Sequence, residues 1–216
     1  MTAHDIRFGQ LAELIGNSPH NLVSNRDRAL LESHHIPEAI AVASVLNAHA
    51  GERWLDLGTG GGLPGLPLAI IFGQTQWTLV DATAKKVQAV DTFISELGLQ
   101  NVGAWQGRAE HVAWEPELRG AFDGVISRAM APMSTLAELA RGFLRPGGTL
   151  AAVKGPTWSD ELNKARRALR LLSYEAPRSR EVPDAPRPTW LVVAKAKGPP
   201  PDAYPRPDGI PKQNPL

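Results

Sequence analysis

Apolar residues recur with two different spacings along the chain. Before residue 50 the spacing is helical and predicts two helices, over 6–16 and 37–49. Beyond residue 50, short apolar runs alternate with helical stretches, an order typical of a mostly parallel sheet flanked by helices. The predicted strands cover 53–57, 77–81, 102–105, 122–126, 149–153, 173–178 and 189–195. The helices that separate them cover 65–72, 84–97, 134–143 and 159–171.

This order predicts an α/β fold with a mostly parallel seven-stranded sheet whose last strand is antiparallel. We expect one domain over 1–216, with an N-terminal helical extension over 1–50 and a core over 51–197. The remaining segment, 198–216, holds seven prolines in 19 residues. Proline lacks the backbone N–H that helices and central strands need, so we expect this segment to wrap the surface as an extended tail.

Amino-acid composition excludes several classes of protein and of site. The 216 residues are 43% hydrophobic, which is enough to bury one sizeable core. The chain has no cysteine, which excludes disulfides, thiolate zinc sites and cysteine nucleophiles, and its six histidines do not form a metal-ligand pattern. No apolar run reaches the ~20 residues of a membrane span, and no signal-peptide pattern opens the chain. We therefore expect a cytoplasmic protein without a metal. We also expect a monomer.

A glycine-rich turn carries the first candidate chemistry. Gly58-Thr59-Gly60-Gly61-Gly62 follows the apolar run at 53–57, and Asp81 ends the next apolar run. Glycines let the backbone turn sharply and approach a ligand, while a carboxylate at a strand end can accept hydrogen bonds from ribose hydroxyls. The sequence therefore predicts a nucleotide-cofactor site. A glycine turn without a ligand is the alternative.

Two residues decide between possible nucleotides. Pro64 has no N–H at the point where a helix N-terminus would present donors to a pyrophosphate. Asp56 would repel a diphosphate, but its carboxylate suits a cationic aminosulfonium, directly or through water. S-adenosyl-L-methionine is therefore favoured over a dinucleotide. A dinucleotide-dependent reductase would also need a proton donor such as Tyr-x-x-x-Lys, and neither Tyr174 nor Tyr204 is so placed.

Positive charge is concentrated toward the C-terminus. Residues 1–153 hold 11 Lys and Arg against 15 Asp and Glu, a net charge of −4, whereas residues 154–216 hold 12 against 7, a net charge of +5. Clustered cations of this kind can neutralise RNA phosphates; the alternative is a solvated helix face. The cluster consists of Lys164, Arg166, Arg167, Arg170, Arg178 and Arg180.

Five motifs together resemble one family. They are Leu55 to Pro67, Asp81 with Lys85-Lys86, Gly107-Arg108-Ala109-Glu110, Ser127-Arg128-Ala129 and Lys154-Gly155. In this combination the chain resembles the bacterial RsmG family, also called GidB. The resemblance implies a class I methyltransferase (Rossmann-like) fold and S-adenosyl-L-methionine-dependent methylation of N7 of a guanine in 16S ribosomal RNA, at the guanine-527 type position of the 530 loop. The expected partner is this RNA or the small ribosomal subunit.

The resemblance also implies roles for individual residues. Asp81 would bind the ribose hydroxyls, and Ala109 and Glu110 would border the adenine. The expected cofactor-binding residues are Asp56, Gly58, Gly60, Gly62, Leu63, Asp81, Ala109, Glu110 and Arg128. The expected catalytic residues, which would contact the base or a phosphate, are Arg128, Lys154 and Arg108. Arg128 belongs to both sets, since an arginine at a strand end could equally bind the RNA backbone. Lys85 and Lys86 are weaker candidates for RNA contacts, with a solvated helix face as the alternative.

Part of the N-terminal region departs from the family pattern. The segments His20-Asn21-Leu22-Val23-Ser24 and Ser33-His34-His35 differ from it at several positions, so the resemblance does not support RNA contacts from this region. Two other functions remain open on sequence grounds. One is methylation of another RNA or of a small molecule, which would use the same cofactor half. The other is non-enzymatic RNA binding, although such a protein would be expected to have lost Asp81 or the glycines.

Overall fold

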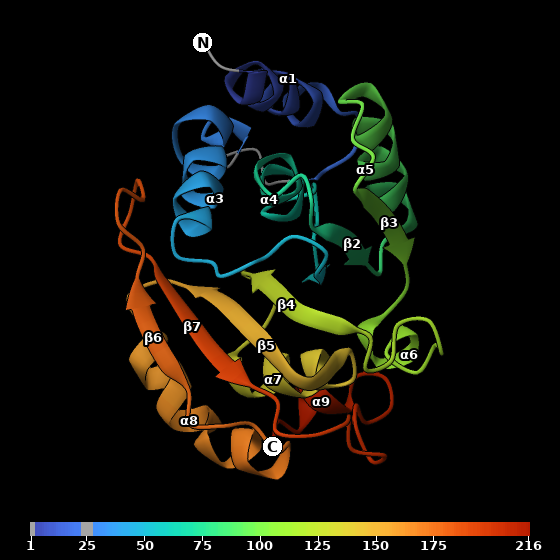
Figure 1. Ribbon diagram of the computed structural model, residues 1–216, viewed down its shortest axis with the longest axis vertical. Coiled ribbons are helices and arrows are strands. Elements are labelled where there is room, and N and C mark those ends of the chain that lie inside the picture. Colours follow the sequence, from blue (N-terminus) through green and yellow to red (C-terminus); the bar gives the residue numbers. More distant parts are fainter. Residues whose placement is uncertain (1–2, 23–27) are drawn as a thin grey trace.

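The computed structural model, which describes residues 3–22 and 28–216, is built around a seven-stranded sheet with strand order β3-β2-β1-β4-β5-β7-β6 (Figure 1). The pairs from β3 to β5 are parallel, and β7 runs antiparallel to both β5 and β6. This confirms the predicted mostly parallel sheet with an antiparallel end. The strands are β1 Arg53–Leu57, β2 Gln76–Asp81, β3 Val102–Gln106, β4 Phe122–Arg128, β5 Leu144–Lys154, β6 Arg178–Glu181 and β7 Trp190–Lys195.

Helices cover both faces of the sheet (Figure 1). One face carries α1 Ala3–Asn17, the π-helical η1 Leu31–His35, α3 Ile36–Ala43, α4 Gly65–Ile71 and α5 Ala84–Glu96. The other face carries α6 Ala109–Val112, α7 Met133–Arg141, α8 Trp158–Leu171 and α9 Ile210–Gln213. Successive strand residues face opposite sides, so Trp54 joins the first core and Leu55 the second.

The N-terminal extension differs from its predicted helices. The helix expected over 6–16 is α1, but the one expected over 37–49 is preceded by η1 and ends at Ala43. The hydroxyl of Ser44 donates a 2.7 Å hydrogen bond to the carbonyl of Ala41, which favours a helix end at this point. Side chains of α1, η1 and α3 lie in one hydrophobic core with α4, α5 and the sheet, so the extension packs directly onto the region from residue 51 onward.

The strand predicted over 173–178 is shifted to 178–181. Pro177 cannot donate to a strand ladder, and Tyr174 forms only an isolated bridge with Ala196. The observed β6 is an edge strand whose four residues are all exposed and polar. Because the sheet buries neither side of β6, no apolar pattern marks it in the sequence.

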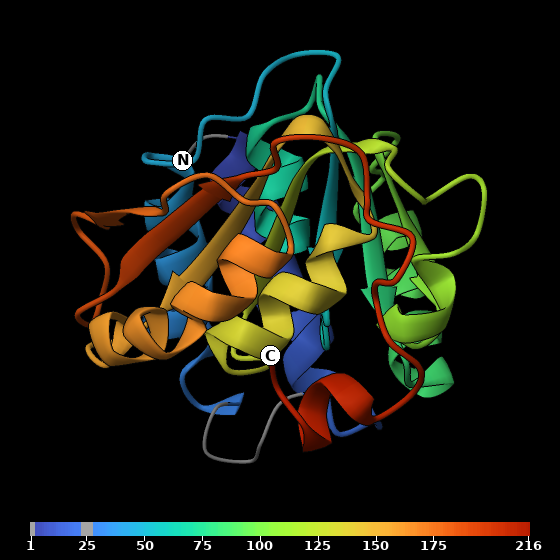
Figure 2. The ribbon, with the colours of Figure 1, turned by 90° about the horizontal axis from the view of Figure 1, so that it is seen from below.

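The proline-rich segment 198–216 runs along the outside of the molecule and then turns into α9 (Figure 2). The sequence predicts no helix in this segment, but α9 is a single turn with Pro211 near its start, where no N–H partner is required. The segment is held by buried polar groups of α7. Arg141, which is fully buried, donates to the carbonyls of Gly198 at 2.6 Å and Pro199 at 2.7 Å.

Candidate functional site

Two hollows open at the carboxyl edge of the sheet beside β1 and β4. The chain connects β1 to strands on one side and β4 to strands on the other, and open α/β sheets bind ligands at such a switch point. A small pocket of about 280 Å³ lies over the ends of β1, β2 and β3, with α6, α7 and α9 around it. A large cleft of about 1370 Å³ lies over the ends of β4 and β5, between α3, α8 and segment 187–189. Gly58 and the segment 130–132 line both hollows.

The glycine-rich turn that separates β1 from α4 has a conformation that requires glycine. Gly58 has a φ of +75°, and a Cβ there would lie 2.8 Å from Cγ of Met130. Gly62 has a φ of +89°, and a Cβ there would lie 2.4 Å from Cδ1 of Leu66. Both positions therefore combine a left-handed backbone with a close approach. Gly62 shapes the turn, while Gly58, Gly60 and Leu63 line the large cleft.

Asp56 is fully buried behind this turn. Its Oδ2 accepts hydrogen bonds from the hydroxyl of Thr59 at 2.7 Å and the amide of Gly65 at 2.9 Å. Burial raises the pKa of Asp56 to about 6, although these two hydrogen bonds act in the opposite direction. The sequence predicts that Asp56 faces the cofactor, but its side chain lies on the α4 side of β1 and lines neither hollow. Asp56 therefore fixes the turn and the start of α4.

Asp81 and Glu110 bring two carboxylates to the small pocket. Asp81 accepts from the amide of Thr83 through Oδ1 at 2.8 Å and from the amide of Gly60 through Oδ2 at 3.0 Å. A carboxylate can accept about four hydrogen bonds, so Asp81 retains capacity toward the pocket. Burial alone would raise the pKa of Glu110, but hydrogen bonds from its own amide and from Gly209, with the charge of Arg108, outweigh burial and lower it.

Ala109, the other residue predicted beside the adenine, and Arg108, which is predicted to be catalytic, also lie at the small pocket. Ala109 and Arg108 line it at the turn between β3 and α6. Nη2 of Arg108 donates to Oε1 of Glu110 at 3.2 Å, and half of the arginine side chain is exposed. Arg108 thus lies at the small pocket, apart from Arg128 and Lys154, which line the large cleft. The three residues predicted to be catalytic do not form one cluster.

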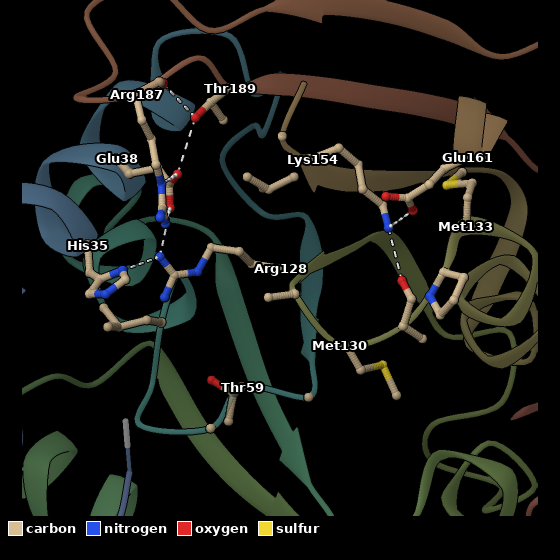
Figure 3. A pocket seen from close by; sticks show the side chains of 18 of the residues that line it. His35, Glu38, Thr59, Arg128, Met130, Met133, Lys154, Glu161, Arg187 and Thr189 are labelled. Atoms are coloured by element: carbon tan, nitrogen blue, oxygen red, sulfur yellow. Dashed lines mark hydrogen bonds and ion pairs between the residues drawn. The ribbon is translucent and has the colours of Figure 1, made fainter. Parts of the chain in front are cut away.

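A buried carboxylate organises one wall of the large cleft (Figure 3). Glu38 accepts from Nη1 of Arg128 at 2.7 Å and from Nε of Arg187 at 2.9 Å. The hydroxyl of Thr189 lies 3.2 Å from the same carboxylate, and Nδ1 of His35 lies 3.1 Å from Nη1 of Arg128. Burial alone would raise the pKa of Glu38, but the hydrogen bonds and charges of the two arginines outweigh it and lower the pKa.

Lys154 lies on the opposite side of the large cleft (Figure 3). Its Nζ donates to the carbonyl of Ala131 at 2.9 Å and pairs with Oε2 of Glu161 at 2.7 Å. Only 9% of the lysine side chain is exposed. Arg128 and Lys154, the two predicted catalytic residues in the cleft, are therefore each held by a carboxylate that no sequence motif marks. In the sequence, Glu38 resembles an ordinary first-turn acid and Glu161 an ordinary helix residue.

The C-terminal basic residues extend from the cleft over the outside of α8 and β6. Lys164 lines the large cleft, and the five arginines of the cluster are exposed. Within residues 3–22 and 28–216, none of these six cations has a carboxylate partner within ion-pair distance. Lys85 and Lys86, in contrast, lie in the first turn of α5 and line neither hollow.

The N-terminal positions that depart from the family pattern are placed as follows. His35 lines the large cleft, whereas Ser33, which is exposed, and His34, which is half-buried, are hydrogen-bonded to each other at 2.7 Å. His20 lies in a separate groove between α1 and α5. Val23 and Ser24 lie outside the described residues. Among the residues that are described, no group of three or more His, Cys, Asp or Glu could hold a metal ion, and no helix is long and apolar enough to span a membrane.

Comparison with known families decides the class of this site. A profile described as GidB, rRNA small subunit methyltransferase G, matches residues 8–185. The chain belongs to this family. Two relatives named ribosomal RNA small subunit methyltransferase G come from Deinococcus deserti, at 39% identity over 97% of this chain and 88% of the relative, and from Deinococcus radiodurans, at 36% over 99% and 86%. Membership of the GidB family confirms the resemblance found in the sequence and the prediction of an rRNA methyltransferase.

Solved structures show the same fold at low sequence identity. A SAM-dependent O-methyltransferase from Thermotoga maritima aligns with a TM-score of 0.59 at 16% identity, covering 87% of this chain and 71% of that chain. A geranyl diphosphate methyltransferase, solved with geranyl diphosphate and sinefungin, aligns with a TM-score of 0.59 at 14% identity, covering 88% and 99%. These similarities confirm the predicted class I methyltransferase fold of this GidB family member.

Proposed function

We propose that this GidB family member transfers the methyl group of S-adenosyl-L-methionine to N7 of a guanine in 16S ribosomal RNA, free or in the small subunit. The observation that carries the proposal is the pair of hollows that meet at Gly58. One hollow is small and presents fixed carboxylates, and the other is large and lined by cations. A donor and an acceptor bound in the two hollows would therefore meet across the glycine-rich turn.

The small pocket suits the adenosine part of the cofactor. Asp81 would accept hydrogen bonds from the ribose hydroxyls, and Ala109 and Glu110 would border the adenine. Gly58 has no side chain, so the backbone that follows β1 can approach a bound cofactor closely. A Cβ at this position would also lie only 2.8 Å from Cγ of Met130. The bound cofactor supplies an electrophilic methyl group on a positively charged sulfur. The buried carboxylate of Asp56, behind the turn, adds negative charge to this end of the site.

Guanine N7 can accept a methyl group without a general base. It carries an in-plane lone pair and no proton, so catalysis depends on how the base is oriented. Orientation of two reactants can contribute on the order of 7–11 kcal/mol at best. Arg128 has five N–H donors, and its contacts with Glu38 and His35 use Nη1. We infer that Arg128 positions the reacting groups, either through guanine O6 or through the cofactor.

RNA affinity would come mainly from outside the cleft. Arg128 and Lys154 already have carboxylate partners, so their charges are partly neutralised before RNA binds. The exposed cations of α8 and β6 have no such partners among the described residues and could contact phosphates along the RNA backbone. Because ribosomal RNA is the proposed substrate, we expect the enzyme to act in the cytoplasm, as a monomer and without a metal.

A labelling experiment tests the proposed reaction. The purified protein would be incubated with radiolabelled S-adenosyl-L-methionine and either unmodified 16S RNA or small subunits from cells that lack this enzyme. We expect label at a single 7-methylguanine, which chain cleavage after borohydride reduction would locate. Label at another base atom, or in none of the RNA substrates, would overturn the assignment. Titration with S-adenosylhomocysteine and with NAD separates the two cofactor classes.

Arg128→Ala tests the positioning role. We expect this variant to lower single-turnover methyl transfer or cofactor affinity far more than it lowers RNA affinity, because Arg128 lies within the cleft beside the turn. Arg180→Ala is the comparison for the outer surface, since Arg180 is exposed on β6 and lines neither hollow. It should weaken RNA binding but leave cofactor affinity and methyl transfer at saturating RNA unchanged. If RNA affinity falls while turnover at saturating RNA is unchanged, Arg128 binds the RNA backbone instead.

A further inference from the structure

The C-terminal segment reaches the small pocket from a distant part of the chain. Lys212, in α9, lines this pocket together with Asp81 and Glu110. From its proline content, the whole segment 198–216 is expected to wrap the surface as an extended tail. We call residues 204–213 the C-terminal strap, and its contacts show that it is a fixed part of the pocket wall.

The strap holds two side chains that line the small pocket. The amide of Gly209 donates to Oε1 of Glu110 at 3.2 Å. The carboxylate of Asp208 pairs with Nε of Arg108 at 3.0 Å through Oδ2 and with Nε2 of His111 at 2.7 Å through Oδ1. Glu110 and Arg108 are thus oriented by residues about 100 positions further along the chain.

The strap is itself anchored to α7, a helix that also lines the small pocket. Arg206 donates to Glu138 through Nε at 2.9 Å and through Nη2 at 2.7 Å, and Glu138 is fully buried. The hydroxyl of Thr135, which is also buried, donates to the carbonyl of Pro211 at 2.9 Å. A charge-assisted pair with two parallel hydrogen bonds defines one geometry. These anchors therefore place Lys212 at the pocket in a defined position along the wall.

We propose that the C-terminal strap is the outer wall of the adenosine pocket and that Lys212 is a specificity-determining residue for the nucleoside. This inference rests on the proposed function, because it takes the small pocket as the adenosine site. Adenine presents an amino group as donor and ring nitrogens as acceptors. Glu110 supplies an acceptor and Lys212 a donor, so the strap and α6 together offer complementary polar groups to this base.

Lys212→Met tests the proposal, because methionine keeps most of the side-chain length and removes the donor. Calorimetric titration would measure the affinities for S-adenosylhomocysteine and for 5′-methylthioadenosine, which lacks the amino-acid part. Loss of one hydrogen bond predicts binding about three- to tenfold weaker for both ligands by the same factor. Lys195→Met is the matched control, since Lys195 is exposed on β7, lines neither hollow and should leave both affinities unchanged.

Asp208→Asn tests the strap by a second route. This change removes the charge that holds Arg108 and His111, and we expect it to weaken both ligands, with the midpoint of thermal unfolding close to that of the wild type. If both variants bind the two ligands as the wild type does, the strap is a surface tail and the inference is overturned. A loss confined to S-adenosylhomocysteine would also overturn it, because Lys212 would then act on the amino-acid part. Failure of the wild type to bind either ligand would instead overturn the proposed function.

Discussion

The small pocket and the large cleft share one turn but fix their charges in opposite ways. In the small pocket, the carboxylates of Asp81 and Glu110 are held largely by backbone amides. In the large cleft, the cations of Arg128 and Lys154 are held by carboxylate side chains. An anion bound by neutral amides keeps its charge and its remaining lone pairs for a ligand. A cation paired with a carboxylate keeps its position but offers less net charge.

This difference suggests how the two halves of the reaction are divided. The small pocket is suited to hydroxyl and amino donors, which a nucleoside provides. The cleft holds its arginine and lysine in fixed places and is suited to orienting a base, while attraction of a polyanion depends on the exposed cations of α8 and β6. Substitutions in the pocket, the cleft and the outer surface should therefore affect different measurements.

The largest effect is expected for Glu38→Ala. Removing this buried carboxylate leaves Arg128, whose side chain is 15% exposed, without its carboxylate partner. Breaking a buried ion pair on one side costs about 3–5 kcal/mol of folding free energy. Urea denaturation would measure the loss. Glu161→Ala is the comparison across the cleft, and it should cost about 1 kcal/mol, because Glu161 is partly exposed and Lys154 keeps the carbonyl of Ala131. Equal losses of folding free energy would show that the two carboxylates stabilise the protein to the same extent despite their different burial.

The turn between the hollows should make stability depend on pH through Asp56. Its pKa is raised from 3.8 to about 6, chiefly by burial. Between these values the folded protein keeps a proton that the unfolded chain has lost, so this group makes stability fall as pH rises. A shift of this size corresponds to a contribution on the order of 3 kcal/mol.

Asp56→Asn should remove that dependence. Relative to the wild type, the free energy of unfolding of the variant should increase by on the order of 3 kcal/mol between pH 4 and pH 7. Denaturation at a series of pH values measures the difference. Asp91→Asn is a control at an exposed position of α5 and should run parallel to the wild type. A parallel curve for Asp56→Asn would mean that the buried carboxylate does not hold its proton in this range.

Asp81→Ala tests whether cofactor binding in the small pocket is independent of RNA binding at the outer surface. We expect cofactor affinity to fall by about 1–3 kcal/mol, the usual loss when polar partners are left unpaired, because the amides of Gly60 and Thr83 and the bound ribose all lose an acceptor. RNA affinity should not change. Calorimetry with S-adenosylhomocysteine and filter binding of RNA give the two values. If the variant binds the cofactor normally, the assignment of Asp81 to the ribose hydroxyls is wrong.

The smallest effect per substituted residue is expected for the exposed arginines of α8, where each substitution should change only RNA affinity. Arg166, Arg167 and Arg170 changed together to Gln should weaken RNA binding regardless of sequence and leave cofactor affinity unchanged. The slope of log affinity against log salt should flatten by about 0.7–0.9 for each phosphate that is no longer neutralised. Filter binding at several salt concentrations measures this slope. An unchanged slope would make this part of α8 a solvated helix face.

The sequence predicts those strands and turns whose residues show a clear apolar pattern or a run of glycines. The apolar runs of β1, β2 and β4 and the glycines that follow β1 are visible in the sequence, and parallel strand ends meet at one edge, so Asp81 and Glu110 could be expected near each other. The sequence also contains the information that Asp56 is buried on the α4 side of the sheet. Asp56 lies between Leu55 and Leu57, which face the opposite core, and successive strand residues face opposite sides. The edge strand β6 was misplaced because its polar residues are ordered by pairing with β7.

The cleft and the strap depend on interactions that no local pattern marks. Glu38 pairs with Arg187 across 149 positions, and Arg187 lies between two prolines in a segment without regular structure. Lys212 reaches the small pocket because a proline-rich segment ends in a single helical turn. Charge counting located the basic third of the chain, but it could not tell which cations have carboxylate partners.

The bond between Glu38 and Arg187 also sets the order in which the enzyme can be completed during translation. Its two residues are made far apart in time, since a chain grows by about 5–20 residues per second and folds as it leaves the ribosome. The helix that carries Glu38 emerges early, together with the partners of its apolar face. Arg128 follows at the end of β4, and Arg187 follows only after β6 has been made. A nascent chain therefore has no complete cleft until segment 187–189 has been made.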